Sequence, residues 1–287
     1  MIEPLVKKLV IFGTGLIGGS FALALKKAGM VREAVGFGRS ANTLAEAKKL
    51  GIIDRTGSEA DLKDADLVLL SAPVGQLQEI LKRIAPLLGK NTLVTDAGST
   101  KGDVAQLARL LGEKSAQFVP AHPIAGGEKS GPSAATADLF EGRKVVLTPL
   151  PENPAASVEK VRRIWEACGA AVSEMSPEEH DEVFAAVSHL PHLLSFALVH
   201  DLAERKNRDL LLSHAASGFR DFTRIAASSP EMWRDICLSN RDALIHEIDR
   251  YAKELGTVRQ ALAEGDAARL EEIFSKARSI RSGWEPG

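Results

Sequence analysis

Short apolar runs alternate with helical patterns along the first half of the chain. Residues 9–12 (LVIF) form a continuous apolar run, which is typical of a parallel strand buried on both faces. Phe21 then begins a helical pattern that ends at Gly29. Further strands are predicted at residues 34–37, 67–71, 92–95, 118–120, 145–148 and 171–173, with helical patterns in most of the gaps, for example 75–88 and 103–111. This alternation predicts an α/β fold with a Rossmann-type, doubly wound parallel sheet.

The pattern changes at Ser176 and Pro177. A hydroxyl side chain, a proline and the acids Glu178 and Glu179 are the residues preferred at the start of a helix. Strand-type alternation stops here, and long helical patterns follow at residues 178–204, 210–227, 232–255 and 266–281. The sequence therefore predicts two domains: an α/β domain over residues 1–175 and an all-α C-terminal domain over residues 176–287.

A glycine-rich turn follows the first predicted strand. Residues 13–19 read GTGLIGG, a G-x-G-x-x-G pattern between a predicted strand and a predicted helix. In this setting Gly13 allows the tight turn, Gly15 lets the backbone approach a pyrophosphate, and Gly18 lets the helix pack closely on the strand. The first-turn amides and the helix dipole bind phosphate charge. The predicted dinucleotide-binding residues are Gly13, Gly15, Leu16, Ile17 and Gly18.

The end of the second predicted strand bears on the type of cofactor. An acid at this point binds the ribose 2′-hydroxyl of NAD, but residues 36–40 read GFGRS and contain none. Arg39 is able to pair with a 2′-phosphate, and Ser40 is able to hydrogen-bond to it. NADP is therefore favoured, with NAD as the other option. The alternative is that Arg39 is a solvated loop residue.

Three segments should lie beyond the carboxyl ends of the strands, where ligands bind in open α/β sheets. In residues 71–74, the small Ser71, Ala72 and Pro73 suit close contact with the cofactor. Residues 96–102 and 120–127 follow the next two predicted strands and contain Ser99 and His122.

His122 lies between two prolines, which fix the local backbone and so orient the imidazole. Oxidation of an alcohol requires a base for the hydroxyl proton, and histidine has a suitable pKa. Ser99 is a candidate hydrogen-bond partner of His122 or of a substrate hydroxyl. The alternatives are a buried or capping histidine and an ordinary turn serine.

The helical domain contributes a second group of polar side chains. Arg220 and Arg224 are four residues apart and share a helix face, and Asp221 is placed to hold a guanidinium. On spacing alone this is an ordinary solvated ion pair. Ser188, His192 and Ser195 form a polar stripe on an apolar helix, which either lines a pocket or binds a second helix. His189 and His192 have the spacing of a metal pair, but no further ligand completes a set, so no metal is expected.

Five motifs carry a resemblance to a known family. They begin at residues 13 (GTGLIGGS), 95 (TDAGSTKG), 122 (HPIAGGEKSGP), 188 (SHLPH) and 218 (GFRDFTRIA, followed by MWRDI). In this order they resemble the prephenate/arogenate (cyclohexadienyl) dehydrogenases of tyrosine biosynthesis over nearly the whole chain. The resemblance implies oxidative decarboxylation of prephenate and/or arogenate to 4-hydroxyphenylpyruvate or tyrosine, with hydride transfer to NADP or NAD.

The resemblance also implies roles for particular residues. His122 corresponds to the general base for the ring hydroxyl and Ser99 to its neighbour, while Arg224 corresponds to the arginine that binds the ring carboxylate. Further substrate-site residues are Ser188, His192, Asp221 and Trp233, although a core role for Trp233 is equally compatible with the sequence. Residues 128–131, which are charged and contain glycine, form either a lid over the substrate or a solvated loop.

Two other functions are compatible with the dinucleotide pattern. A β-hydroxyacid-type dehydrogenase typically uses a lysine on the interdomain helix, and this chain has no lysine there before Lys206. A non-catalytic NADP sensor has no use for both His122 and Arg224. The C-terminal helices carry more apolar surface than one layer buries, notably at 243–255 and 270–280, which predicts a homodimer. A monomeric helix bundle is the alternative.

Composition excludes several classes of partner. The 287-residue chain has 36 basic and 38 acidic side chains and a formal net charge of -2, so no dominant charge favours nucleic acid or an anionic membrane. Cys168 and Cys237 form no CxxC or disulfide framework. The N-terminus lacks the pattern of a signal peptide, and no apolar run approaches the roughly 20 residues of a membrane span. A cytoplasmic protein without a membrane segment is expected.

Overall fold

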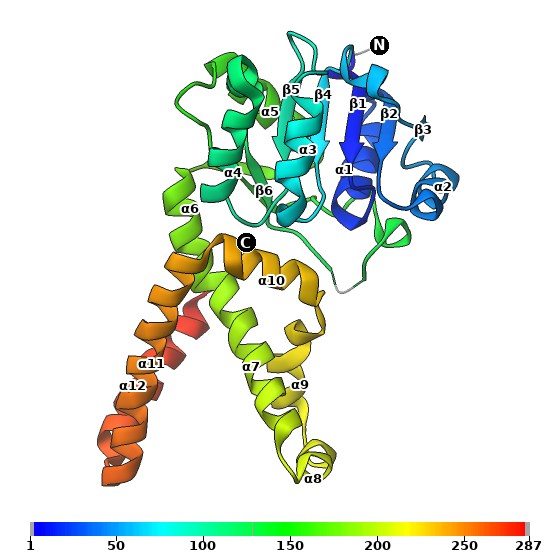
Figure 1. Cartoon of the computed structure of the whole chain (residues 1–287). Helices are drawn as coiled ribbons and strands as arrows, with labels where there is room; N and C mark the ends of the chain where they lie inside the picture. Colours follow the sequence, from blue (N-terminus) through cyan, green and yellow to red (C-terminus); the bar gives the residue numbers. More distant parts are fainter. Residues whose placement is uncertain (1–2, 128, 285–287) are drawn as a thin grey trace.

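The N-terminal half of the computed structural model is a Rossmann-type α/β domain (Figure 1). The structure describes residues 3–127 and 129–284, so Glu128 of the predicted lid segment lies outside the described residues. Five parallel strands run in the order β3-β2-β1-β4-β5. Their bounds are β1 Val6–Phe12, β2 Val31–Phe37, β3 Arg55–Thr56, β4 Leu67–Leu70 and β5 Leu93–Asp96. The predicted fold class is confirmed.

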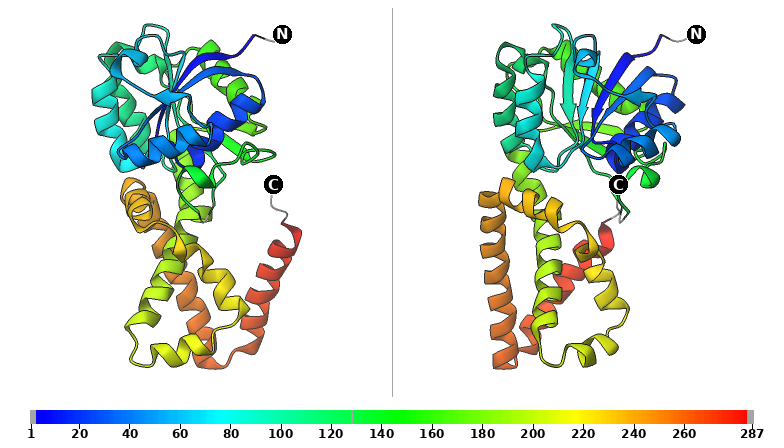
Figure 2. Two further views of the ribbon diagram at one scale, coloured as in Figure 1. Left: turned by 90° about the vertical axis from the view of Figure 1, so that its right-hand side faces the viewer. Right: turned by 45° about the vertical axis from the view of Figure 1, so that its right-hand side comes forward.

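Helices cover both faces of this sheet (Figure 2). Alternate residues of β1 point to opposite faces, so Ile11 packs in a cluster with Phe21 and Trp165, whereas Val10 packs with Leu81 and Phe118. The helices of this half are α1 Leu16–Lys27, α2 Ala41–Lys49, α3 Leu77–Ile84, α4 Gly102–Ala108 and α5 Ala155–Ala167, with short 3-10 turns between them. Burial on both faces explains the continuous apolar strand runs in the sequence.

A second, three-stranded sheet corrects one sequence-based expectation. Phe118 makes a single parallel bridge to Val94, and the next strand begins only at Ala121. The strands are β6 Ala121–Pro123, β7 Lys144–Leu147 and β8 Ala171–Glu174. β6 pairs antiparallel with β7, opposite to the sense of the parallel sheet. His122 therefore lies within a strand, not in a loop after one, because Pro120 has no N–H to extend the parallel ladder.

The C-terminal half is all-helical. Its elements are α6 Pro177–Phe184, a π turn Ala185–His189, α7 Leu190–Glu204, α8 Arg208–Ser213, α9 Ser217–Thr223, a 3-10 turn Arg224–Ala227, α10 Pro230–Ser239, α11 Arg241–Glu264 and α12 Ala267–Gly283. Ser176 caps α6 as its sequence indicated, since its Oγ accepts a hydrogen bond from the Glu179 N–H at 3.0 Å. The π turn ends two residues before Pro191, which has no N–H for the helical ladder. Two predicted helices, 210–227 and 232–255, are each divided in the structure.

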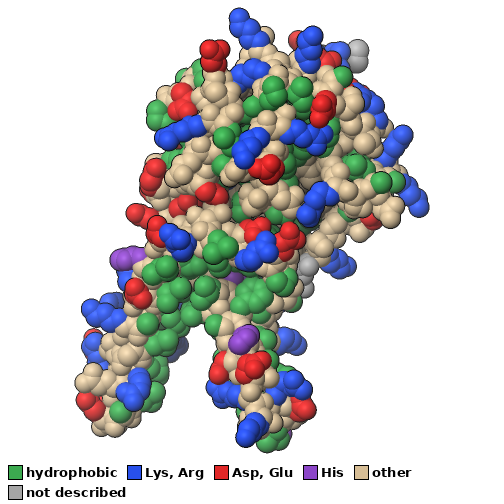
Figure 3. Space-filling view, in the orientation of Figure 1, with side chains coloured by type: hydrophobic (Ala, Val, Ile, Leu, Met, Phe, Trp, Pro, Cys, Tyr) green, Lys and Arg blue, Asp and Glu red, His purple; other side chains and the backbone are tan. Residues whose placement is uncertain are grey.

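The long helices extend away from the sheet domain and leave apolar surface uncovered (Figures 2 and 3). Exposed apolar side chains of α11 and α12 are Ile245, Tyr251, Leu255, Leu262, Phe274 and Ile280. The stretch Pro177–Glu204 is one continuous helix of 28 residues with a mean hydropathy of 1.4, long and apolar enough by composition to cross a membrane. The sequence-based statement that no run approaches this length was wrong, because interspersed His and Ser side chains divide the apolar positions. Some of these polar side chains, including His180, His189 and Ser195, are buried within the protein, as in a core helix.

Two glycines of the turn after β1 are required for different physical reasons. Gly13 has a φ of +100°, in the region that favours glycine. A Cβ on Gly18 would lie 2.1 Å from the Gly13 carbonyl oxygen and 2.2 Å from Ser71 Oγ. In contrast, a Cβ on Gly15 would meet no atom within 4 Å. The turn therefore has a closed side at Gly18 and an open side at Gly15.

This contrast gives a matched pair of substitutions. We expect Gly18→Ala to destabilise the fold by about 1–3 kcal/mol, because backbone must move to admit the methyl group. Gly15→Ala should change stability by less than about 1 kcal/mol but weaken dinucleotide binding roughly tenfold, because its methyl group occupies the approach to the pyrophosphate. Thermal denaturation and a fluorescence titration with NADPH measure the two effects. Equal destabilisation by both variants would contradict this account.

Candidate active site

The candidate cofactor residues surround the carboxyl ends of β1 and β4. Ser71 Oγ donates hydrogen bonds to the carbonyl oxygens of Gly13 at 2.7 Å and Phe12 at 3.2 Å. The Ser71 hydroxyl thus joins the end of β4 to the glycine-rich turn. Ala72 and Pro73 follow it and are half-buried, as are Leu16 and Ile17 at the start of α1. The turn leaves backbone N–H groups at the N-terminus of α1, where phosphate charge is favoured.

Arg39 and Ser40 lie exposed just beyond the end of β2. Ser40 Oγ accepts a hydrogen bond from the Thr43 N–H at 3.3 Å and caps α2, which leaves its own O–H able to donate. Within the described ranges, the Arg39 guanidinium has no hydrogen-bond or ion-pair partner. Both groups are therefore available to a 2′-phosphate.

A buried ion pair fixes the loop after β5. Lys101 Nζ lies 2.7 Å from Asp96 Oδ2, and both side chains are fully buried. The same ammonium donates to the carbonyl oxygens of Gly98 at 2.8 Å and Thr100 at 2.9 Å. Asp96 Oδ1 in turn accepts the Ala121 N–H at 3.0 Å. One ion pair thus holds both the Ser99 loop and the first residue of β6, next to His122.

The imidazole of His122 belongs to a chain of buried polar groups. Its Nδ1 lies 2.8 Å from His180 Nε2, and His180 Nδ1 lies 2.8 Å from Asp181 Oδ1. Phe184 packs edge-on against the His122 ring, with 4.8 Å between centroids. Burial, together with the charge of Lys101, holds the pKa of His122 well below its usual range. His122 is therefore neutral and able to accept a proton.

The predicted pairing of Ser99 with His122 is not formed. Ser99 is half-buried, and its hydroxyl makes no hydrogen bond to His122 in the part of the chain that the structure describes. His180 occupies the hydrogen-bonding position on His122 instead. Ser99 lies in the loop held by Lys101, so its remaining predicted role is contact with substrate.

Two further buried side chains, Asn240 and His189, join segments of the helical domain beside this loop. Asn240 Nδ2 donates to the Asp181 carbonyl oxygen at 2.7 Å and lies 3.1 Å from His189 Nδ1. Burial lowers the pKa of His189 to about 4. These bonds connect the start of α11 with α6 and the π turn.

His192 and Trp233 form an aromatic pair on α7 and α10. Their ring centroids are 3.8 Å apart, and the planes differ by 20°. His192 Nδ1 lies 2.9 Å from the Ser188 carbonyl oxygen, to which it donates, so its Nε2 is unprotonated in the neutral ring. Burial lowers the pKa of His192, and the positive charge of Arg224 lowers it further. The predicted residues Ser188, His192, Arg224 and Trp233 are therefore close together.

Two other polar residues have structural contacts. Ser195 Oγ donates to the Phe222 carbonyl oxygen at 3.2 Å and so binds α7 to α9, which is the helix-binding alternative for this part of the stripe. Asp221 is exposed and lies 3.4 Å from Arg220 Nε. Its support of Arg224 stays a prediction. No group of three or more His, Cys, Asp or Glu side chains suited to a metal occurs among the described residues.

Comparison with known proteins assigns both halves of the chain. Residues 21–174 match the family model for the prephenate dehydrogenase nucleotide-binding domain, and residues 176–276 match the model for its dimerization domain. The chain belongs to the prephenate dehydrogenase family. The prephenate dehydrogenase of Bacillus subtilis is 38% identical over 96% of this chain and 75% of its own length. The cyclohexadienyl dehydrogenase of Zymomonas mobilis is 35% identical over 96% of this chain and 95% of its own.

The fold of a solved relative agrees with this assignment. The prephenate dehydrogenase of Aquifex aeolicus, in complex with hydroxyphenyl propionate and NAD+, superposes with a TM-score of 0.90 at 39% identity, covering 96% of this chain and 97% of its own. The resemblance seen in the sequence motifs is confirmed: the protein is a prephenate/arogenate-type NAD(P)-dependent dehydrogenase of tyrosine biosynthesis. The β-hydroxyacid alternative is not supported.

The sequence argument assigned no role in the site to several buried residues beside it. They are Asp96, Lys101, His180, Asp181, His189 and Asn240, all buried. Asp96 and Lys101 lie in a motif that the sequence did single out, but nothing in their spacing shows that both side chains turn inward. His180 and Asp181 had the pattern of an ordinary first helical turn after a cap.

The Lys101–Asp96 pair should make stability depend on pH in one variant. Burial raises the pKa of Asp96, and the ion pair with Lys101 partly offsets this. Lys101→Met removes the offset and leaves an unpaired buried carboxyl, so we expect a loss of about 3–5 kcal/mol near neutral pH. A folded-state pKa above the unfolded value means that stability is present at low pH and is lost as the pH rises through the folded pKa.

The loss in Lys101→Met should therefore be smaller at about pH 5 than at about pH 8, as measured by urea denaturation at each pH. The double variant Asp96→Asn, Lys101→Met is the control. It buries no lone charge and should recover part of the loss, with little pH dependence. A single variant whose deficit is the same at both pH values would argue against an unpaired buried carboxyl.

Proposed function

We propose that this chain oxidatively decarboxylates prephenate, arogenate or both, with His122 as the base. The observation that carries this proposal is the neutral, buried His122, whose Nδ1 is engaged by His180. The residue keeps a small exposed fraction of 8%. A base of this kind takes the proton of the ring hydroxyl as hydride leaves the carbinol carbon. Loss of carbon dioxide then aromatises the ring, which needs no metal.

Binding of the ring carboxylate is assigned to Arg224. Arg224 is near enough to His192 for its charge to lower the histidine's pKa, and His192 stacks on Trp233. A guanidinium presents paired donors that match a carboxylate. Ser188 lies in the π turn that precedes α7, and Asp221 lies in α9, just before the turn that begins at Arg224. Ser99, in the loop after β5, is assigned as a contact for the substrate hydroxyl. In the solved relative, the bound hydroxyphenyl propionate is likewise an aromatic carboxylate.

The cofactor site fits a dinucleotide. The open side of the turn at Gly15 and the α1 N-terminus suit a pyrophosphate, and the nicotinamide supplies the hydride acceptor when bound. We propose a preference for NADP, because no acid ends β2 and the Arg39 guanidinium is available there. The relative that was solved with NAD+ indicates that members of this family also accept the cofactor without a 2′-phosphate. We therefore propose that the protein prefers NADP but also accepts NAD.

We also propose that the two domains bind different ligands and that the protein is a homodimer. Residues 1–175 bind the dinucleotide, and residues 176–287 bind substrate and form the dimer. Only 28% of the most apolar window of Pro177–Glu204 is buried within one chain, and α11 and α12 carry the exposed apolar side chains named above. The match to a dimerization domain supports the same surface. A C2 pair of these helices would cover it.

The first experiment measures steady-state reduction of NADP and of NAD with prephenate and with arogenate. We expect turnover of one substrate or both, with higher kcat/KM for NADP. Arg39→Ala is the matched variant in the same four assays. It should lower kcat/KM for NADP by roughly 10-fold to 100-fold, and by less than about 2-fold for NAD, because a charged hydrogen bond to the 2′-phosphate is lost.

Absence of turnover with either substrate would refute the proposed function. Equal losses for NADP and NAD in Arg39→Ala would instead refute only the 2′-phosphate role and leave the reaction intact. The two parts of the proposal are thus separable in one set of assays.

The dimer is tested by light scattering coupled to size-exclusion chromatography at micromolar concentration. We expect a mass of about twice 30.7 kDa. Ile245→Glu combined with Leu262→Glu, two exposed apolar positions on α11, should shift the protein toward the monomer. A monomeric wild-type protein would refute the dimer.

A further inference from the structure

Two polar side chains, His180 and Asp181, continue a row of hydrogen bonds from the imidazole of His122. His122 Nδ1 lies 2.8 Å from His180 Nε2, and His180 Nδ1 lies 2.8 Å from Asp181 Oδ1. The His180 side chain is fully buried, while the Asp181 side chain retains 11% exposure. The row of hydrogen bonds therefore leads from His122, through the buried His180, to a side chain in contact with solvent.

The hydrogen positions along this chain follow from the partners of Asp181. Its Oδ1 accepts the Lys101 N–H and its Oδ2 accepts the Gly102 N–H, each at 2.8 Å. Burial acts to raise the pKa of Asp181, but the hydrogen bonds from His180 and from these two amides outweigh it and lower the pKa below its usual value. An ionised carboxylate only accepts hydrogen bonds. His180 Nδ1 must therefore carry the hydrogen.

The tautomer of His180 in turn determines the tautomer of His122. Burial lowers the pKa of His180, so this ring is neutral, and with its hydrogen on Nδ1 its Nε2 is an acceptor. His122 Nδ1 must then be the donor. In the neutral His122 ring this leaves Nε2 without a hydrogen, which is the state a base requires.

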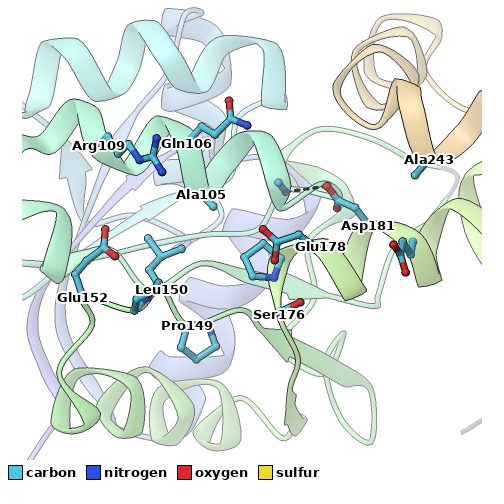
Figure 4. A pocket seen from close by; sticks show the side chains of 14 residues that line it. Ala105, Gln106, Arg109, Pro149, Leu150, Glu152, Ser176, Glu178, Asp181 and Ala243 are labelled. Atoms are coloured by element: carbon cyan, nitrogen blue, oxygen red, sulfur yellow. Dashed lines mark hydrogen bonds between the residues drawn. The ribbon is translucent and has the colours of Figure 1, made fainter.

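Asp181, the last of the three hydrogen-bonded groups, lines a cavity of about 700 Å³ between the two domains. Figure 4 shows Asp181 at its edge, hydrogen-bonded to the backbone at the start of α4, with Glu178, Arg109 and Gln106 around the space. Glu178 comes from the same helix as Asp181, and among the described residues no hydrogen bond or ion pair joins its side chain to either histidine. Solvent thus reaches Asp181 through this cavity, which residues of α4 and α6 line.

We propose that His180 and Asp181 form a proton relay that carries the substrate proton from His122 to the interdomain cavity. The inference rests on the proposed reaction. As the substrate O–H bond breaks, an N–H bond forms at His122 Nε2, while the Nδ1 hydrogen of His122 moves to His180 Nε2. The Nδ1 hydrogen of His180 then moves to Asp181, which releases it to solvent and becomes a carboxylate again. After the product leaves, the Nε2 hydrogen of His122 is lost to solvent in the open site, and a proton that enters at Asp181 passes back through His180 to His122 Nδ1, which restores the starting tautomers.

The surroundings of His122 explain why a relay is useful. The cation Lys101 and the rings of His180 and His189 all face His122 and disfavour a positive charge on it. Asp96, the acid nearest Lys101, is already paired with that lysine. With a relay, the positive charge does not stay on His122, since the arriving proton is balanced by the departing one. The charge is instead neutralised at Asp181.

The test begins with the ligand-free protein, in which nitrogen-15 NMR of the histidine rings reports the tautomer of each. We expect His122, assigned by its absence in His122→Asn, to be neutral with hydrogen on Nδ1. Hydrogen on Nε2 would overturn the proposal. This measurement needs no turnover, so its failure is distinct from a failure of the proposed reaction.

The second part compares three variants in the steady-state assay. His180→Gln keeps an acceptor for His122 but has no basic nitrogen to pass a proton. It should retain the His122 tautomer and KM, while kcat falls roughly 10-fold to 100-fold with a larger solvent deuterium isotope effect. His180→Phe removes the acceptor and should also produce a mixture of His122 tautomers. Glu178→Gln removes a charge at the cavity but leaves His122, His180 and Asp181 unchanged, so it should leave kcat unchanged.

A His180→Gln enzyme with wild-type kcat and isotope effect would overturn the relay. If His180→Phe fails to fold, the NMR of the wild-type protein and the kinetics of His180→Gln still decide the question. A merely structural role of His180 would change stability in both variants but would not separate kcat from the His122 tautomer.

Discussion

The buried ion pair between Lys101 and Asp96 organises the site more than any other interaction in the structure. Each charge would be costly to bury alone, but three oxygen acceptors surround the ammonium, and backbone N–H groups satisfy the carboxylate. The pair holds the loop after β5 and the start of β6, which carry Ser99 and His122. The backbone N–H of Lys101 also binds Asp181, so the same residue connects the sheet domain to the helical domain.

Burial of four histidines determines their protonation state around this ion pair. Burial is the largest influence on His122, His180, His189 and His192, and in each case it lowers the pKa. These rings are therefore neutral at ordinary pH, and their hydrogen bonds decide which nitrogen is available as an acceptor. The interdomain helix supplies three of the four, and the short strand β6 supplies the fourth. Domain packing and acid–base chemistry are thus provided by the same side chains.

The interdomain helix also explains an apparent conflict in composition. It is apolar enough to resemble a membrane span, yet it carries buried polar side chains that are hydrogen-bonded to Asp181, Asn240 and Phe222. Its apolar side chains are mostly half-buried in one chain, and Val183 and Val187 are exposed. A second copy that covers the apolar face would stabilise the helix and hold the polar face in register with the sheet domain.

The sequence by itself determined the features that depend on local pattern. Apolar runs, glycine spacing and the cap at Ser176 predicted the parallel sheet, the dinucleotide turn and the change to helices, because each follows from backbone geometry over a few residues. The motifs also placed His122, His192 and Arg224 as site residues. The register of the sixth strand was wrong, since pairing between distant segments decides where a strand begins.

Only the tertiary structure decided the partners of those residues. His122 is brought to His180 and Asp181 by segments from both domains, and sequence spacing contains no information on such contacts. Lys101 and Asp96 are only five residues apart, but their spacing does not show that both side chains turn inward. The same holds for the pKa values and tautomers of the histidines, because burial and the direction of a hydrogen bond arise only when the chain is folded. The sequence therefore determined which groups are present, and the fold decided which of them are charged and which are able to accept a proton.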